Sequence, residues 1–453
     1  MWARKRIDIL WSDLALGLLA TAVPIDRRRL AGRIEALWAP AGDGLACLSV
    51  RSGLDLLLSA LDLPPGSEIL MTAVTIDDMR RIVDAHGLTA VPVDLDPADM
   101  SPAVDALERA ATSRTRAIVV AHLFGGRVDL VPILSWAHAR GVLVIEDCAQ
   151  AFCGPADRGH PESDVAMFSF GSIKTCTALG GALLRVRERA AIERMRSLQS
   201  KWPSQRRTGF AAKIVKYAGL KFLSGPWVFS CFVHGCRRLG YDYDALLNRW
   251  VRGFASADLL ARLRRQPSAP LLALLLHRLR TFDHARLASR SAKGELLARH
   301  LKKRCQEPFL APLGGQAQTE THRHTHWVFP ILCREPERVI AALVAAGFDA
   351  NRGGSLVALP APADRPELHP AIAAEAVRNL VYLPCYADLP DRELARMADV
   401  VAQATGQQAA VPALPLRPAT GRNARVSPRR VPVSDGWQRH AEERRFGASD
   451  LSA

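Results

Sequence analysis

Several features are scarce in this sequence, and each absence narrows the class of protein. Aromatic residues make up only 6% of the 453 residues. No uninterrupted apolar run of about 18 residues predicts a membrane-spanning helix. The nine cysteines are odd in number and lack paired spacing, which favours reduced thiols over a disulfide framework or a zinc site. Acidic residues are outnumbered, 45 against 60 Lys and Arg, and the formal charge of +15 favours an anionic partner of some kind.

The N-terminus has the superficial layout of a signal peptide, with basic residues before an apolar stretch at 9–23. Asp13 interrupts that stretch, and no small-residue cleavage site follows it. We therefore expect a cytoplasmic protein.

Short apolar runs rich in β-forming residues alternate with helical patterns between residues 45 and 186. The expected strands cover residues 46–50, 68–72, 90–94, 117–121, 143–146, 166–169 and 182–185. This alternation predicts an α/β fold with a mostly parallel seven-stranded sheet covered on both faces. A later pattern with strands at 327–332 and 380–383 predicts a smaller C-terminal α+β domain.

Composition divides the chain into four parts. We expect a large domain over 1–200, a helical insertion rich in aromatics and cations over 201–270, and a long helix with the small domain over 271–405. After residue 405, prolines and arginines replace large apolar side chains. Residues 406–453 are therefore predicted to form a disordered basic tail.

Two motifs at expected strand ends have both a plain and a functional interpretation. Residues 51–54 (Arg-Ser-Gly-Leu) join a strand to a helix, where free backbone N–H groups suit a phosphate, although an ordinary turn is the plainer interpretation. His122 ends another core strand, where a histidine is usually structural.

Two further motifs combine a carboxylate with a lysine. Asp147 follows a buried strand, where open α/β sheets bind ligands, although it could instead cap a helix. Lys174 follows Ser169 among apolar and small residues, and burying its charge is costly without a partner or a task. Desolvation would favour the neutral amine, which forms imines with aldehydes. The alternative is a lysine whose amine reaches solvent.

Together these motifs resemble the DegT/DnrJ/StrS-type sugar aminotransferases, a family of fold-type I enzymes that depend on pyridoxal 5'-phosphate (PLP). The resemblance covers roughly residues 9–405. It is carried, in chain order, by Ser-Gly-Leu at 52–54, His-Leu-Phe-Gly at 122–125, Ile-Glu-Asp-Cys-Ala-Gln-Ala at 145–151 and Phe-Ser-Phe-Gly-Ser-Ile-Lys at 168–174.

The resemblance implies a fold-type I homodimer in which Lys174 is the catalytic residue, holding PLP as a Schiff base and moving protons. Asp147 would pair with the ring nitrogen and Gln150 with the ring oxygen. The other expected cofactor contacts are Ser52, Gly53, Leu54, Ile76 and Ser169. The reaction implied moves an amino group from glutamate or glutamine to a keto sugar, typically nucleotide-linked, in polysaccharide or glycan biosynthesis.

The sequence departs from the family pattern at three site positions. Leu54 replaces a threonine on the phosphate side, Ile76 replaces the aromatic that stacks on the ring, and Phe152 replaces a histidine. The segment that reaches the neighbouring subunit is also missing. Its nearest counterpart contains Arg264 and Arg265, which we expect, with His122, to bind substrate.

These departures keep a second function class open, namely a catalytically reduced PLP-fold protein that acts as a binding or regulatory module. Residues 211–238 contain lysines interspersed with aromatic residues. Such a segment can form a helical pair at the dimer interface, and peripheral contact with a membrane is the alternative. Nucleic acid is not the expected partner, because no recognised motif accompanies the charge. His322, His324 and His326 lack a carboxylate or cysteine at ligand spacing, so no metal is expected.

Overall fold

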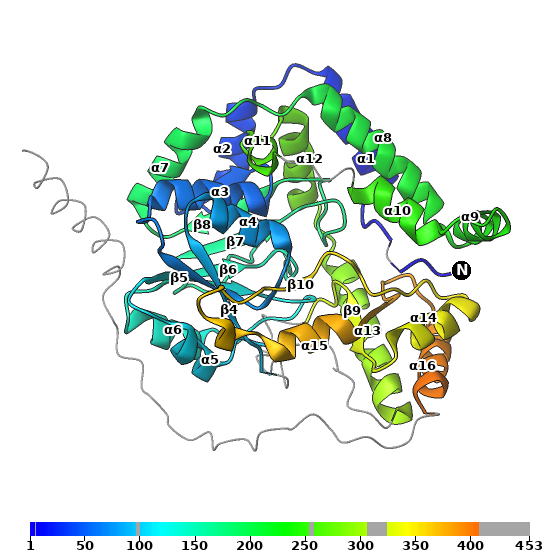
Figure 1. Ribbon diagram of the computed structural model, residues 1–453. Coiled ribbons are helices and arrows are strands. Elements are labelled where there is room, and N and C mark those ends of the chain that lie inside the picture. Colours follow the sequence, from blue (N-terminus) through cyan, green and yellow to red (C-terminus); the bar gives the residue numbers. More distant parts are fainter. Residues whose placement is uncertain (5, 97–99, 253–257, 306–323, 407–453) are drawn as a thin grey trace, which may run out of the picture.

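A computed structural model describes residues 1–4, 6–96, 100–252, 258–305 and 324–406 (Figure 1). At its centre lies a seven-stranded sheet in the order β1 (Gly44–Cys47), β8 (Ala182–Val186), β7 (Val165–Ser169), β6 (Leu143–Asp147), β5 (Thr115–Ala121), β2 (Glu68–Thr72) and β4 (Thr89–Val93). Strands β4, β2, β5, β6 and β7 are parallel, and β8 is antiparallel to both of its neighbours. The predicted mostly parallel seven-stranded sheet is confirmed.

Helices cover both faces of the sheet because its strands are apolar on both sides. On one face pack α3 (Val50–Leu61), α4 (Asp77–Ala85) and α7 (Arg189–Ser200). The other face is shared by α5 (Val104–Ala110), α6 (Val131–His138), α1 (Trp11–Ala22), α2 (Arg27–Trp38), α8 (Arg207–Leu223) and α12 (Ala269–Arg280). In β7, Met167 joins the first core while Ala166 and Phe168 join the second, as the two-residue period of a strand requires.

The first strand ends earlier than predicted. It was expected over 46–50 and covers Gly44–Cys47. The chain leaves the sheet because Ser49 caps α3, its hydroxyl accepting a hydrogen bond from the Ser52 N–H at 3.1 Å. Residues 51–54 therefore lie inside the first turns of α3, and the prediction of a turn before the helix was wrong.

The smaller C-terminal unit contains an antiparallel pair, β9 (Phe329–Leu332) with β11 (Leu380–Leu383). Around it lie α13 (His284–Arg304), α14 (Pro336–Ala345), α15 (Ala371–Asn379), α16 (Asp391–Thr405) and the short η1 (Pro366–Leu368). A second short pair, β3 (Val74–Thr75) with β10 (Val357–Ala358), ties this unit to the large one. The predicted small α+β domain is confirmed.

The chain's first residues pair with the C-terminal unit. The Trp2 N–H donates to the Gly347 carbonyl at 2.8 Å, and the Asp349 N–H donates to the Trp2 carbonyl at 2.9 Å. The sequence analysis had assigned these residues to the large domain. The four proposed boundaries stay predictions, and residues 407–453 of the expected tail lie outside the described residues.

The segment expected as a helical insertion contains α8, α9 (Pro226–Arg238), α10 (Tyr243–Arg252) and α11 (Leu259–Leu263). Large apolar side chains are exposed along α1, α8 and α9, among them Trp11, Val215, Phe222 and Trp227. Within the described residues, no helix combines the length and apolar character needed to span a bilayer. No disulfide joins the described cysteines.

Candidate functional site

Three neighbouring strands end at the edge of the sheet where the motifs lie. β6 pairs in parallel with β5 and with β7. Their carboxyl ends, at Ala121, Asp147 and Ser169, therefore meet at one edge. Ligands of open α/β sheets bind at such an edge. The structure brings Asp147 and Ser169 together with the loop that carries Lys174.

Lys174 lies between β7 and β8, in a turn that its own backbone N–H closes on the Gly171 carbonyl at 3.0 Å. Its Nζ atom lies 3.9 Å from the centroid of the Trp327 ring. Burial lowers the pKa of Lys174 to about 8, while Asp147 raises it and Arg51 lowers it further. The amine therefore loses its proton near pH 8 rather than near the ordinary lysine value, which makes the nucleophilic form more accessible.

Asp147 is the carboxylate that faces this amine. Burial raises the pKa of Asp147, while the Ala149 N–H, donating to Oδ1 at 2.9 Å, and the charge of Lys174 lower it. Residues 149–151 form a turn, so Asp147 does not cap a following helix. A half-buried carboxylate at this position can pair with a protonated ring nitrogen.

Gln150 and Phe152 follow Asp147 in the chain, and among the described residues one has a free polar end while the other is part of the core. Gln150 accepts a hydrogen bond from the Phe124 N–H at 2.8 Å through its carbonyl oxygen, which leaves its NH2 group as the donor end of the side chain. That end suits a ring oxygen. Phe152 packs edge-to-face on Phe168 and Phe170, with centroids 5.9 and 5.1 Å away. The position where the family has a histidine is therefore a core position in this chain.

The expected phosphate end lies at the start of α3. The hydroxyls of Ser49 and Ser52 are 3.0 Å apart, and the Gly53 N–H donates to the Ser49 carbonyl at 2.9 Å. Leu54 is 0% exposed and belongs to the core between α3 and the sheet, so its side chain cannot contact a phosphate. A Cβ atom at Gly53 would lie 2.7 Å from Leu184, so close packing on β8 accounts for this glycine.

The loop at Gly180 and Gly181 is hydrogen-bonded both to the segment after β7 and to the segment before α3. The Gly180 N–H donates to the Phe170 carbonyl, and the Gly181 N–H donates to the Leu48 carbonyl, each at 2.9 Å. The Nζ atom of Lys213, from α8, lies 3.7 Å from the position of a Cβ atom at Gly180. A second lysine amine therefore lies beside the segment that joins the Ser169 and Ser52 regions.

The sequence analysis missed Lys213 as a site residue and placed it in an amphipathic segment. Burial lowers the pKa of Lys213 to about 8, and Lys216 and Arg51 lower it further. Helical spacing could have identified it, because Lys213 lies three residues after Phe210 and one before Ile214, both buried. A lysine on the apolar face of a helix needs a partner or a task.

Ile76 and Ser169 are the remaining residues predicted to contact the cofactor. Ile76 precedes α4 and packs against the core that α3 and α4 share. The Ser169 hydroxyl accepts a hydrogen bond from the Gly171 N–H at 3.3 Å. Their contacts with a cofactor stay predictions.

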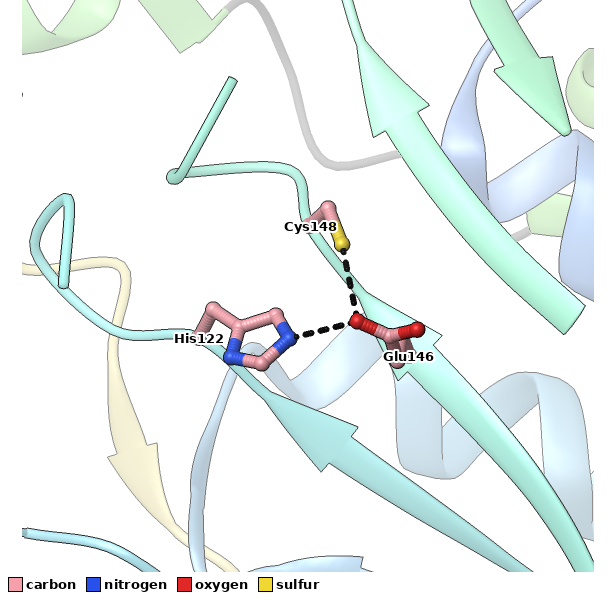
Figure 2. Close-up of side chains that lie close together, drawn as sticks. All are labelled: His122, Glu146 and Cys148. Carbon is pink, nitrogen blue, oxygen red and sulfur yellow. Dashed lines mark hydrogen bonds and ion pairs between the residues drawn. The ribbon is translucent and has the colours of Figure 1, made fainter. Parts of the chain in front are cut away.

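His122, Glu146 and Cys148 form a buried cluster beneath the site (Figure 2). His122 Nε2 lies 2.9 Å from Glu146 Oε2, its Nδ1 accepts from the Val128 N–H at 3.0 Å, and the Cys148 thiol donates to Glu146 at 3.7 Å. These bonds occupy both ring nitrogens of a residue that is 1% exposed, which favours the structural interpretation of His122, and its contact with substrate stays a prediction.

The same three side chains have the spacing of metal ligands, with ligand atoms within 4.8 Å of one another. Burial raises the pKa of Cys148 well above its usual value and so favours the thiol over the thiolate that metals bind. Hydrogen bonds from His122 and Ser163 outweigh burial and lower the pKa of Glu146 to about 2. Hydrogen bonding within the protein accounts for this cluster, which ties β5 to β6.

The expected substrate arginines have other contacts. Arg264 donates from Nε and Nη2 to the two carboxylate oxygens of buried Asp55, each at 3.0 Å. This fork-to-fork pair occupies the guanidinium, so the substrate role predicted for Arg264 is not supported. Arg265 is half-buried beside it, and its role stays a prediction.

Of the three histidines considered for a metal, His322 lies outside the described residues. His324 Nδ1 accepts a hydrogen bond from the His326 N–H at 3.0 Å, and the two rings lie 4.1 Å apart. This local contact accounts for His324 without a ligand.

Two solved structures of aminotransferases share this architecture. The aminotransferase TlmJ from Streptoalloteichus hindustanus superposes with a TM-score of 0.64 at 19% identity, covering 90% of this chain and 99% of its own. PseC from Helicobacter pylori, an aminotransferase of pseudaminic acid biosynthesis, gives 0.63 at 16% identity, covering 90% and 100%. The chain has the fold of this class.

Residues 32–221 match the model of the DegT/DnrJ/EryC1/StrS aminotransferase family. A UDP-N-acetyl-3-dehydro-alpha-D-glucosamine 3-aminotransferase from Acidithiobacillus ferrooxidans is 35% identical over 153 residues, and GDP-perosamine synthase from Caulobacter vibrioides 34% over 158. These alignments cover 33% and 34% of this chain and 42% of each relative, so the chain matches less than half of their length.

The environment of Lys174 predicts its reactivity towards aldehydes. PLP added to cofactor-free protein should bind covalently with a pH midpoint of about 8, because the neutral amine is the reactive form. Asp147→Asn removes a charge that raises the pKa of Lys174, so this midpoint should move to lower pH. Absorbance titration measures both values. A midpoint near the ordinary lysine pKa of about 10.4 would show that the amine is solvated.

Proposed function

We propose that this protein is a PLP-dependent aminotransferase that moves an amino group from glutamate or glutamine to a nucleotide-linked keto sugar. The observation that carries the proposal is the half-buried Lys174 amine, with a pKa lowered to about 8, beside the Asp147 carboxylate. Neither side chain caps a helix: Asp147 accepts from the Ala149 N–H, and the Lys174 amine lies against the Trp327 ring.

The residues at the strand edge fit the parts of PLP. When bound, PLP supplies an aldehyde and an electron-withdrawing ring. We propose that Lys174 bonds to the aldehyde, Asp147 keeps the ring nitrogen protonated and Gln150 donates to the ring oxygen. The start of α3, with Ser52 and Ser169, would hold the phosphate.

Two cations near the proposed phosphate site, Arg51 and Lys213, were not among the cofactor contacts predicted from the sequence. Arg51 and Lys213 interact electrostatically, and Arg51 also lowers the pKa of Lys174. Arg51 already pairs with Asp78, whereas the half-buried Lys213 is a second cation near the helix N-terminus, where a bound anion would offset the repulsion between them. We propose that Lys213 supplies the contact that the apolar Leu54 cannot make.

The acceptor is proposed from chemistry shared with the relatives. Their names describe enzymes of UDP- and GDP-linked sugars, whose diphosphates are anionic. The formal charge of +15 favours such substrates. Lys174, with a pKa near neutral, can accept and return the proton that amino transfer moves at the substrate carbon.

We propose a homodimer in which the exposed apolar side chains of α1, α8 and α9 contact the second copy. Trp227 is 87% exposed and Phe222 64% exposed, and large apolar side chains gathered on one surface mark an interaction site. Peripheral attachment to a membrane through the same helices is the alternative.

A half-reaction tests the proposed chemistry. PLP-loaded protein mixed with L-glutamate or L-glutamine should release the corresponding keto acid and shift the cofactor's absorbance. Lys174→Ala should abolish the shift, and Asp147→Asn should slow it by about 100- to 1,000-fold, the usual loss when a preorganised charge is removed. Asp129→Asn, at an exposed aspartate, is the control. Wild-type rates in Asp147→Asn would rule out its role at the ring.

Removing the Lys213 amine should weaken PLP binding. Lys213→Met should raise the dissociation constant by about 10- to 100-fold, the range for a hydrogen bond to a charged group. Absorbance titration of cofactor-free protein gives this constant. Lys216→Met, at an exposed lysine on the same helix, should change it little. Equal constants for the two variants would remove Lys213 from the phosphate site.

The proposed dimer is tested by light scattering. The wild-type protein should have the mass of two chains, and Trp227→Glu should shift it towards one chain. Val131→Glu, at a 59% exposed valine on α6, should leave the mass unchanged. A wild-type monomer that binds liposomes, and loses that binding on Trp227→Glu, would instead support the membrane alternative.

A further inference from the structure

A cavity of about 500 Å³ adjoins the proposed active site. Its wall includes Trp327, whose ring lies against the Lys174 amine, and Thr175, the residue after Lys174. The N-terminal segment, the end of α12, the start of α13 and the chain after β11 supply most of the remainder. The volume is that of a small-molecule site.

Cations dominate the wall of this cavity. It contains six Arg or Lys side chains and four aspartates. Four of the six cations form ion pairs, namely Arg4 with Asp349, Arg6 with Asp388, Arg278 with Asp13 and Arg286 with Asp8. Among the residues that the structure describes, Lys221 and Arg290 form no ion pair.

Arg290 is the more deeply buried of these two cations. It is 9% exposed, and its guanidinium donates to two neutral acceptors, the Thr325 carbonyl at 2.8 Å and the Thr175 hydroxyl at 3.0 Å. Burial lowers its pKa, which is the electrostatic cost of a charge without a carboxylate partner. A guanidinium has five N–H donors, so donors remain for a ligand.

The two acceptors place Arg290 close to the reacting lysine. Thr175 follows Lys174 directly, and Thr325 lies two residues before Trp327. Arg290 therefore connects the segment that carries the reacting amine to the segment that carries the ring against it. Lys174 itself does not line the cavity. An anion that bound Arg290 from the cavity would therefore lie next to Thr175 and Trp327, the two neighbours of the amine.

We propose that Arg290, assisted by Lys221, binds an anionic oxygen group of the substrate, either a carboxylate or a phosphate. This inference rests on the proposed function, because it assigns a substrate anion to the cavity beside Lys174. The planar guanidinium would hold the anion through paired N–H donors, and Lys221 would add charge nearer the mouth. The amino donor offers a carboxylate, and a nucleotide-linked acceptor offers a diphosphate.

The competing explanation is that Arg290 only clamps the two threonine segments together. A clamp would affect stability and PLP content. A binding residue would change ligand affinity while both of those stay constant.

Isothermal titration calorimetry with two unreactive probes separates these explanations. Glutarate imitates the donor's carboxylates and UDP imitates the acceptor's diphosphate. In the full-length, PLP-loaded protein, Arg290→Gln should weaken at least one probe by about 10- to 100-fold, the range for hydrogen bonds to a charged group. Thermal midpoint and PLP absorbance should match wild type. Arg6→Gln, which lines the same cavity but pairs with Asp388, should change affinity less than about threefold, as for a surface ion pair.

The probe that Arg290→Gln weakens identifies the group that Arg290 binds. Loss of glutarate alone assigns the carboxylate of the donor, and loss of UDP alone assigns the phosphate of the acceptor. Unchanged affinity for both probes, or no binding of either by wild type, overturns the proposal. Arg290-dependent binding in a protein that takes up no PLP would keep the anion site and overturn the proposed function instead. If Arg290→Gln fails to fold, Lys221→Met must weaken the same probe at least threefold, or the proposal fails.

Discussion

The partial burial of Lys174, which desolvates its amine, is the constraint on which the account depends. A lysine ammonium held away from water is costly, and the protein contains only a partial counterweight in Asp147, whose own pKa burial raises. Each group therefore makes the charge of the other more tolerable, since Asp147 raises the pKa of Lys174 and Lys174 lowers that of Asp147. Such a pair at the carboxyl edge of a parallel sheet has a physical explanation in chemistry and none in packing.

The surrounding structure holds this pair in place. The parallel strands β5, β6 and β7 end at the same edge of the sheet. The buried Glu146 of β6 accepts hydrogen bonds from His122, which follows β5, and from Ser163, which precedes β7. On one side, α3 brings its N-terminus to the site, and the loop at Gly180 lies beside Lys213. On the other side, Arg290 holds the segment of Trp327 against that of Lys174. The departures from the family pattern fit this view, since Leu54 and Phe152 are core residues.

Much of this arrangement could be predicted from the sequence, because strand ends follow from local patterns. The runs at 143–146 and 166–169 put Asp147 and Ser169 at one edge once the sheet is taken as parallel. The start of α3 was misplaced because a single capping hydroxyl, that of Ser49, ends β1 early. Side-chain contacts between segments far apart in the sequence could not be predicted from local patterns. Nothing local shows that Arg264 pairs with Asp55, or that Arg290 lacks a carboxylate among the described residues.

The most direct test of the central claim is to trap the cofactor on the protein. PLP-loaded protein should be treated with borohydride, digested and examined by mass spectrometry. The account predicts one modified peptide, containing Lys174, and no modification in Lys174→Ala. Modification of another lysine, Lys213 included, or of none, would contradict the claim that Lys174 is desolvated for covalent chemistry.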